Sequence, residues 1–314
     1  MEELASGLRF PEGPIALSDG SVLVCEIEAG RLSRVSPDGT NEVAAETGGG
    51  PNGAAIGPDG AVYVCNNGGV FVWEERMGLT VPGGPPPDAW TGGSIQRVDL
   101  ESGAVDVLYT ESQSVDEGGT TSTVPLRAPN DLVFDAHGGF WFTDHGARLQ
   151  RSSDRTGIHY AKADGSSCRE VIHPLDAPNG IGLSPGGGTL YTAETHTGRV
   201  WQWEVTGPGE VAVTNPVGPG GGTLLAGLPG MQLLDSLAVD AAGWVCVGTL
   251  VNGGITAIEP DGSPIEHTVL PDPLVTNICF GGRGHRTAYV TLSGTGKLLA
   301  MDWPRPGLPL AYSA

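Results

Sequence analysis

Six oxygen-bearing side chains recur at one position of a repeated phrase, and together they offer a donor set suited to a hard metal ion. They lie in the stretches PEGPIAL, PNGAAI, PNDLVF, PNGIGL, LDSLAV and TNICFG, as Glu12, Asn52, Asn130, Asn179, Asp235 and Asn277. Carboxylate and amide oxygens are the ligands that Ca²⁺, Mg²⁺ or Mn²⁺ prefer, and no Cys or His shares this position. We therefore expect one divalent cation, Ca²⁺ first, with Mg²⁺, Mn²⁺ or Zn²⁺ as alternatives.

Turn chemistry is the competing explanation for these residues. Asn followed by Gly or Asp favours turns, because Asn tolerates positive φ and its side chain bonds to its own backbone. That explanation suffices for each Asn taken singly. It does not explain why all six positions carry a carboxylate or a carboxamide at the same phase of a repeat, directly before an apolar run.

The element that must position these residues is a strand, because each of them precedes a strand-like phrase. The phrase consists of an apolar strand, a Gly-centred turn and a second apolar strand. Its second half occurs six times, as LSDGSVLVCE, GPDGAVYVCN, FDAHGGFWFTD, LSPGGGTLYTAE, VDAAGWVCVG and GGRGHRTAYVT. A further strand opened by Gly follows each copy, so that each unit carries about four strands.

Six such units in 314 residues give about 52 residues each, close to the roughly 40 to 50 residues of a four-stranded propeller blade. The sequence therefore predicts an all-β fold: a six-bladed β-propeller with four-stranded antiparallel blades around a central metal-binding channel. The first strand of each blade lines that channel. The six oxygen-bearing side chains are then expected to converge near its axis.

A single domain over residues 1–314 is expected, with extra length in the second unit. The excess lies near residues 77–93 and 110–126, which we interpret as long loop insertions on one face. Long loops over a rigid scaffold often shape a binding site.

Composition narrows the classes of partner. With 51 Gly and 25 Pro the chain favours short strands and turns, and Asp plus Glu outnumber Lys plus Arg by 36 to 16, which disfavours nucleic acid. Residues 1–10 do not resemble a signal peptide and no apolar run is long enough to span a membrane. The five cysteines are widely spaced, as expected for reduced thiols. We expect a cytoplasmic protein without membrane partners.

Four motifs in register carry a family resemblance: PEGP at 11–14, APND at 128–131, APNG at 177–180 and LDSLAVD at 234–240. With them the sequence resembles the gluconolactonase and regucalcin (senescence marker protein) family of six-bladed propellers, from about residue 8 to 304. The resemblance implies that the catalytic cation is held at Glu12, Asn130, Asn179 and Asp235. It also implies a metal-dependent lactonase that acts on a small-molecule lactone.

One departure from the family pattern leaves the reaction open. The strand after the first metal-binding Asn runs into FTDHG here, where the commoner gluconolactonase pattern has Asp-Pro and a Tyr. A related propeller group hydrolyses organophosphates with a similar ligand set. The alternatives are therefore a phosphotriesterase-like hydrolase and a non-catalytic calcium-binding propeller.

The resemblance assigns Asp235 a second role, that of general base. It would accept a proton from the attacking water while the cation polarises the lactone carbonyl. A purely structural ligand role for Asp235 is the alternative.

Substrate contacts are expected from residues around the channel mouth. Arg127 offers a fork of donors, and His145 follows Asp144 at the end of a strand that faces the mouth. Asn52 and Asn277, the remaining members of the set of six, are also expected to bind substrate. Whether two propellers pair into a homodimer is left open.

Overall fold

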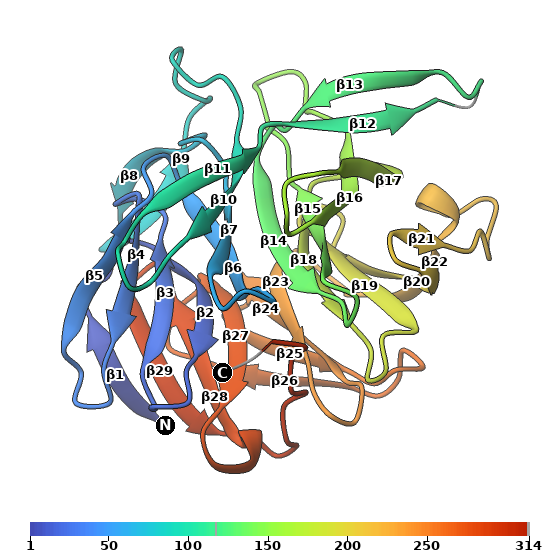
Figure 1. The fold of residues 1–314 in the computed structure, drawn as a ribbon. Helices are drawn as coiled ribbons and strands as arrows, with labels where there is room; N and C mark the ends of the chain where they lie inside the picture. Colours follow the sequence, from blue (N-terminus) through green and yellow to red (C-terminus); the bar gives the residue numbers. More distant parts are fainter. Residues whose placement is uncertain (117, 313–314) are drawn as a thin grey trace.

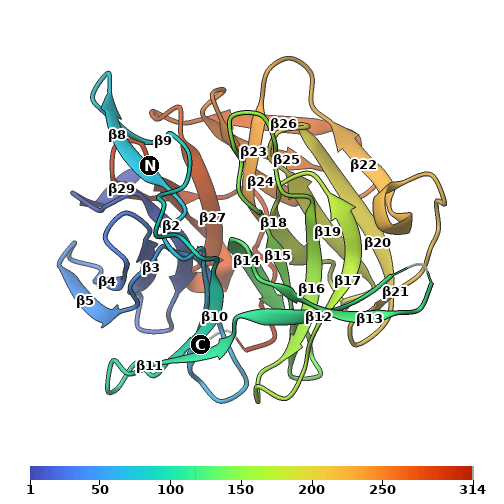
Figure 2. The same cartoon turned by 90° about the horizontal axis from the view of Figure 1, so that it is seen from above.

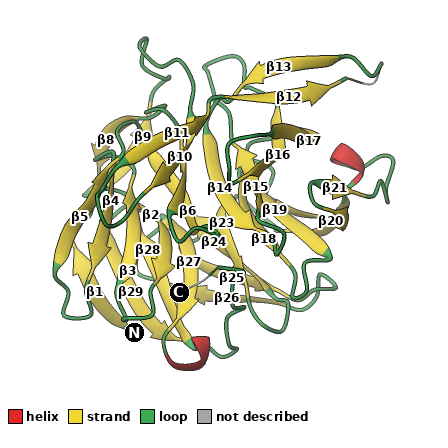
Figure 3. Cartoon of the chain, viewed as in Figure 1, coloured by secondary structure: helices red, strands yellow, loops and turns green. Residues whose placement is uncertain are grey.

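Six small antiparallel sheets surround one axis, and together they form a six-bladed β-propeller (Figures 1 and 3). The computed structural model describes residues 1–116 and 118–312. Besides strands these residues form two short 3-10 helices, Pro219–Gly221 and Arg283–His285. No helix within the described residues is long and apolar enough to cross a membrane. The fold predicted from the six repeats is confirmed.

The first three blades are built in chain order from the innermost strand outwards. Blade 1 consists of β2 (Pro11–Ala16), β3 (Val22–Glu26), β4 (Arg31–Val35) and β5 (Asn41–Glu46). Blade 2 consists of β6 (Pro51–Ile56), β7 (Val62–Asn66), β10 (Ser94–Val98) and β11 (Val105–Tyr109). Blade 3 consists of β14 (Pro129–Phe134), β15 (Gly139–Asp144), β16 (Thr156–Lys162) and β17 (Cys168–Leu175).

The last three blades follow the same order, except that the N-terminal strand completes blade 6. Blade 4 consists of β18 (Pro178–Leu183), β19 (Thr189–Glu194), β20 (Arg199–Gly207) and β22 (Thr223–Gly227), with β21 (Glu210–Val211) beside β20. Blade 5 consists of β23 (Leu233–Val239), β24 (Val245–Leu250), β25 (Gly254–Ile258) and β26 (Ile265–Val269). Blade 6 consists of β27 (Val275–Gly281), β28 (Thr287–Leu292), β29 (Lys297–Asp302) and β1 (Glu2–Ser6).

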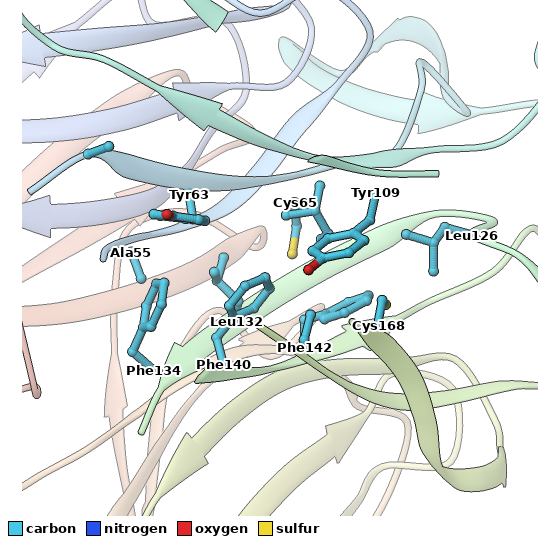
Figure 4. Packing of buried hydrophobic residues seen from close by; sticks show 13 residues of the cluster. Ala55, Tyr63, Cys65, Tyr109, Leu126, Leu132, Phe134, Phe140, Phe142 and Cys168 are labelled. Atoms are coloured by element: carbon cyan, nitrogen blue, oxygen red, sulfur yellow. The ribbon is translucent and has the colours of Figure 1, made fainter. Parts of the chain in front are cut away.

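The core is divided among the interfaces between neighbouring blades. The aromatic packing between blades 2 and 3 is one of these interfaces, with Tyr63 against Phe134 and Phe140 (Figure 4). Each blade has neighbours on both faces, so the second strands are largely buried and mostly apolar, as in the fully buried Val62–Asn66. In β3, Val22 and Val24 face blade 6 while Leu23 and Cys25 face blade 2.

Strands also occupy the two segments that the sequence indicated as loops. β8 (Val72–Arg76) and β9 (Leu79–Gly83) form a hairpin between β7 and β10. β12 (Glu111–Val115) and β13 (Thr121–Pro125) form a second hairpin, which projects from blade 3 (Figures 1 and 2). The segment 110–126 therefore contains both strands of a β-hairpin. The segment 77–93 contains only β9, because β8 lies before residue 77 and residues 84–93 carry no strand, as expected for a loop.

The chain segment after β29 crosses the base of the channel, the end where the innermost strands finish. The Leu308 N–H donates to the Val239 carbonyl of blade 5 at 3.2 Å, and the Tyr312 ring lies 5.7 Å from the Phe134 ring of blade 3. This C-terminal segment helps to enclose a mostly apolar cavity of about 110 Å³, which extends along the innermost strands as far as Asp131 and Asn277. The channel therefore has a covered base and a mouth at the opposite end.

Candidate metal and active site

All six oxygen-bearing side chains lie near the beginning of the innermost strand of their blade, at the mouth of the channel. Their exposed fractions are 1% for Glu12, 4% for Asn52, Asn130 and Asn179, 8% for Asp235 and 5% for Asn277. One such residue from each of the six blades is thus buried around the axis, on β2, β6, β14, β18, β23 and β27.

A break in strand pairing accompanies each of these residues. The register between the innermost and the second strand shifts at the same point in every blade, for example between Glu12 and Ile15 and between Pro178 and Ile181. Such bulges re-aim side chains. The side chains of the six residues therefore do not follow the regular up-and-down alternation of a strand at the point where the innermost strands come closest.

Close approach of neighbouring strands explains the Gly that follows three of the polar residues. A Cβ added to Gly53 would lie 2.6 Å from the Asp131 Cα, and one added to Gly180 would overlap the Leu237 backbone N. Gly13, with φ +49, would meet the Asn52 carbonyl oxygen in the same way. The Pro-Asn-Gly motif here marks strands that converge, not a reverse turn.

Hydrogen bonds link four of the blades at the mouth. Glu12 Oε2 accepts from the Asn277 Nδ2 at 2.7 Å and from its neighbour's backbone, Gly13 N, at 2.6 Å. The Ser236 hydroxyl lies 3.3 Å from Asn179 Oδ1 and 3.5 Å from Glu12 Oε2. These contacts orient Glu12 and Asn179 toward one another.

Three buried oxygens at the mouth have no hydrogen-bond partner among the described residues: Glu12 Oε1, Asn52 Oδ1 and Asn130 Oδ1. An acceptor buried without a donor is costly, and such groups in folded proteins normally have a partner, an ordered water or an ion. The three orphaned oxygens come from blades 1, 2 and 3, so they fit a ligand that is electropositive and shared between blades.

Negative charge gathers at the same place. Burial, followed by the charge of Glu12, raises the pKa of Asp131 and of Asp235 well above the usual range, and burial raises the pKa of Glu12. Within residues 1–116 and 118–312, no ion pair includes any of these three carboxyl groups. A cation bound between them would favour their ionised forms.

The donor set fits a hard cation better than a transition metal. Among the described residues, no group of three or more His, Cys, Asp or Glu side chains is placed to hold a metal ion. The candidate site instead combines the carboxylates of Glu12 and Asp235 with the amide oxygens of Asn130 and Asn179. Such an oxygen set, completed by water, is typical of Ca²⁺.

Sequence reasoning missed two residues of the mouth, Asp131 and Ser236. Asp131 Oδ1 accepts from the Leu132 N–H at 2.9 Å, and its Oδ2 accepts from the Ile181 N–H of blade 4 at 3.3 Å. A signal was present, because Asp131 and Ser236 stand where three other repeats have Gly. The Asp131 side chain thus joins blade 3 to blade 4 and adds a third buried carboxyl group to the mouth.

Arg127 lies on the rim of the mouth, and its guanidinium already contacts two protein side chains. Its Nε lies 3.0 Å from Asp154 Oδ2, and its Cζ lies 4.4 Å from the centre of the Trp90 ring. The structure therefore places Arg127 in an ion pair and a cation–π contact at the rim, outside the ring of six oxygen-bearing side chains.

His145 lies beside His196, with the ring centres 5.9 Å apart. Burial lowers the pKa of His145, and burial, followed by the charge of His145, lowers the pKa of His196 to about 4. Both rings are therefore neutral near pH 7. The preceding Asp144 holds the local backbone, since its carboxylate accepts from Arg127 N, Ala128 N and Gly146 N.

Comparison with known proteins finds one matching family and relatives that are named as lactonases. The family described as SMP-30/gluconolactonase/LRE-like region matches residues 10–294. The chain is 27% identical over 273 residues to lactonase drp35 of Staphylococcus saprophyticus, covering 86% of this chain and 72% of that protein. It is 25% identical over 274 residues to lactonase drp35 of Staphylococcus haemolyticus, covering 84% and 70%.

Solved structures share the fold. A gluconolactonase from Xanthomonas campestris superposes with a TM-score of 0.72 at 21% identity, covering 96% of this chain and 89% of that one. A calcium-binding regucalcin from Agrobacterium tumefaciens superposes with a TM-score of 0.70 at 17% identity, covering 97% and 94%. The resemblance drawn from the four sequence motifs is confirmed, and the chain belongs to the SMP-30/gluconolactonase/LRE-like family.

Proposed function

We propose that this protein is a metal-dependent lactonase that uses one divalent cation to open a cyclic ester. Ca²⁺ is the preferred candidate, and its proposed ligands are Glu12, Asn130, Asn179 and Asp235. The observation that carries the proposal is the set of orphaned buried oxygens beside mutually repelling carboxyl groups at the channel mouth. The names of the relatives, lactonase and gluconolactonase, support lactones as the substrate class.

The reaction is a hydrolysis. A water oxygen attacks the lactone carbonyl carbon, the ring C–O bond breaks, and the released alkoxide takes up a proton to give a hydroxy acid. A bound divalent cation supplies stabilisation of the negative charge that develops on the carbonyl oxygen.

Asp235 is the proposed general base. It is buried at the mouth on blade 5, and its neighbour Ser236 lies within hydrogen-bond distance of Asn179. An ionised carboxylate is needed to accept the proton from water. Burial and the charge of Glu12 raise the pKa of Asp235, and a cation held by Glu12 and Asp235 would lower it again, so Asp235 is expected to act as a base only when the cation is bound.

Substrate-binding roles are proposed for Asn52, Arg127, His145 and Asn277, with differences among them. Asn52 Oδ1 has no hydrogen-bond partner among the described residues and can accept from a donor on the substrate. Asn277 donates to Glu12, which suits a positioning residue for the cation's ligand. His145 and Arg127 lie on the rim, where neutral imidazole and guanidinium can contact groups beside the lactone ring.

The test uses metal-stripped protein and a panel of aldonolactones and simple aliphatic or aromatic lactones. Acid release is followed after Ca²⁺, Mg²⁺, Mn²⁺ or Zn²⁺ is added back, in the wild type and in Asp235→Ala. Asp164→Ala, at an exposed hairpin turn, is the control. We expect metal-restored turnover that Asp235→Ala lacks and Asp164→Ala keeps.

Turnover that survives complete metal removal would exclude the metal-dependent mechanism. If calcium binds tightly but no lactone is opened, the metal site stands and lactone hydrolysis is wrong.

A further inference from the structure

We infer that the lactone substrate carries an apolar or aromatic substituent, because a strip of aromatic and apolar side chains lies beside two of the candidate metal ligands, Glu12 and Asn130. The inference rests on the proposed lactonase activity and names its substrate class. The aromatic strip is defined by six residues of the segments before β2 and β14 and of the β7–β10 connection: Phe10, Val70, Phe71, Trp73, Trp90 and Ala128.

One end of the aromatic strip lies beside the candidate metal ligand of blade 1. Phe10 is two residues before Glu12, and its ring centre lies 4.8 Å from that of Trp73. The Phe71 ring lies 5.7 Å from the Trp73 ring in an edge-to-face arrangement. Three aromatic rings are thus in continuous contact next to the beginning of β2.

The other end lies beside the candidate metal ligand of blade 3. Val70 and Ala128 form a buried apolar cluster with Ala147, and Phe71 and Trp90 pack against it. Ala128 is two residues before Asn130. The Trp90 Nε1 donates to the Asn67 carbonyl at 2.9 Å, so the polar atom of this indole is satisfied within the protein.

Hairpin β8–β9 holds the middle of the strip in place across the mouth. The hairpin leaves blade 2, yet the Thr80 N–H donates to the Gly294 carbonyl of blade 6 at 2.9 Å. It therefore reaches from blade 2 to blade 6, the two neighbours of blade 1, and its Trp73 ring contacts Phe10 directly before blade 1. Phe71 and Trp73 remain partly exposed on the strip.

The chemistry of the strip suits an apolar group. Its members contribute ring faces and methyl groups. The guanidinium of Arg127 lies against the Trp90 ring, and it is already paired with Asp154. A polyhydroxylated substituent needs donors and acceptors to replace its water, whereas an aryl or alkyl group gains from leaving water. The strip therefore selects against sugar lactones.

Three δ-lactones with the same ring test the inference on calcium-loaded protein: δ-valerolactone, its phenyl-substituted derivative and glucono-1,5-lactone. We expect kcat/KM for the phenyl lactone to exceed that for gluconolactone at least about tenfold. Trp73→Ala should raise KM for the phenyl lactone about five- to tenfold, with a smaller effect on δ-valerolactone, since aromatic contacts add roughly this much.

Two matched variants separate a lost contact from a damaged hairpin. Trp73→Phe keeps a ring against Phe10 and should restore most of the KM. Val72→Ala changes the adjacent, exposed residue of the same hairpin and should alter no parameter.

The outcomes for the two proposals are distinguishable. Preference for gluconolactone, or an equal effect of Trp73→Ala on all three lactones, overturns the inference while leaving lactonase activity intact. If no lactone is opened, the lactonase proposal fails, and calorimetric binding of the phenyl lactone then decides the inference. Binding that is equal in the wild type and Trp73→Ala would refute it.

Discussion

The two ends of the channel are lined by the same six strands and yet differ in chemistry. At the mouth each innermost strand carries a buried oxygen-bearing side chain near its beginning, and three of these oxygens have no hydrogen-bond partner in the described part of the chain. Toward the base the same strands end in large apolar side chains such as Ile15, Val133 and Phe280, covered by the C-terminal segment. A few residues of strand separate the two environments.

This difference indicates that stability and function are divided along each strand. Buried unpaired oxygens and like charges disfavour folding, whereas the apolar base favours it. The base and the six blade interfaces can therefore offset the cost of assembling the mouth. Substitutions on one strand, two residues apart, should separate the two contributions.

The largest expected effect is on activity, at the mouth end of β23. Asp235→Asn keeps one oxygen near the cation but removes the proposed base, so kcat should fall about 10²- to 10⁴-fold. Calcium binding, measured by calorimetry, should weaken much less. If kcat falls only in proportion to lost calcium, Asp235 is a ligand and not the base.

On the same strand, two residues toward the base, Leu237→Ala should act on stability. Leu237 is buried in the interface between blades 4 and 5 and lines the apolar cavity. Its truncation should lower the free energy of unfolding by about 2–4 kcal/mol. In urea titrations the midpoint should fall, while kcat of the folded fraction stays near wild type. A specific loss of kcat would contradict the division between the two ends.

Calcium should change how stability depends on pH. The pKa values of Asp131 and Asp235 are raised in the folded protein, so without metal these groups contribute stability that is fully present below about pH 4 and lost as pH rises through the folded pKa values. Bound calcium favours the ionised forms, so the difference in Tm between calcium and chelator should widen as pH rises from 5 to 8. At calcium concentrations of 100 Kd the stabilisation should reach about 2.7 kcal/mol. Parallel curves would show that these carboxyls do not face the ion.

The smallest effect is expected at the covered base. Tyr312→Ala removes an edge-to-face contact with Phe134 and should lower the free energy of unfolding by about 1 kcal/mol. Because the contact lies at the far end of the channel, kcat/KM should not change. Thermal unfolding and initial rates on one preparation measure both quantities. A drop in kcat/KM would show that the base of the channel affects catalysis at the mouth.

The blades could be predicted from the sequence because each one is encoded by a local phrase. Strand pairs such as β2–β3 are joined by short turns, which leave their signature in consecutive residues. The pairing of β1 with β29 leaves no such signature, since its partners are about 295 residues apart. The hairpins β8–β9 and β12–β13 were also missed, because their largely polar strands have little apolar alternation.

For the candidate site, the repeat phase brought out the six oxygen-bearing side chains but not their contacts. Asp131 was hidden beside Asn130, where it resembled a turn residue, and its role follows only from the close approach of β18. The aromatic strip could not be predicted from spacing, because Phe10 and Trp73 meet only through the path of the β8–β9 hairpin. Contacts between distant loops depend on the folded backbone.

The pairing of β1 with β29 also constrains how the chain folds during its synthesis. Glu2 pairs with Ala300, so the sixth sheet cannot be completed until residues 297–302 have left the ribosome. Until then the N-terminal strand has no partner, and the apolar face of β3 that packs on blade 6 stays uncovered. Release of residues 297–302 from the ribosome is thus the step that closes the ring, and a nascent chain stalled before it should stay sensitive to protease at both blade 1 and blade 6.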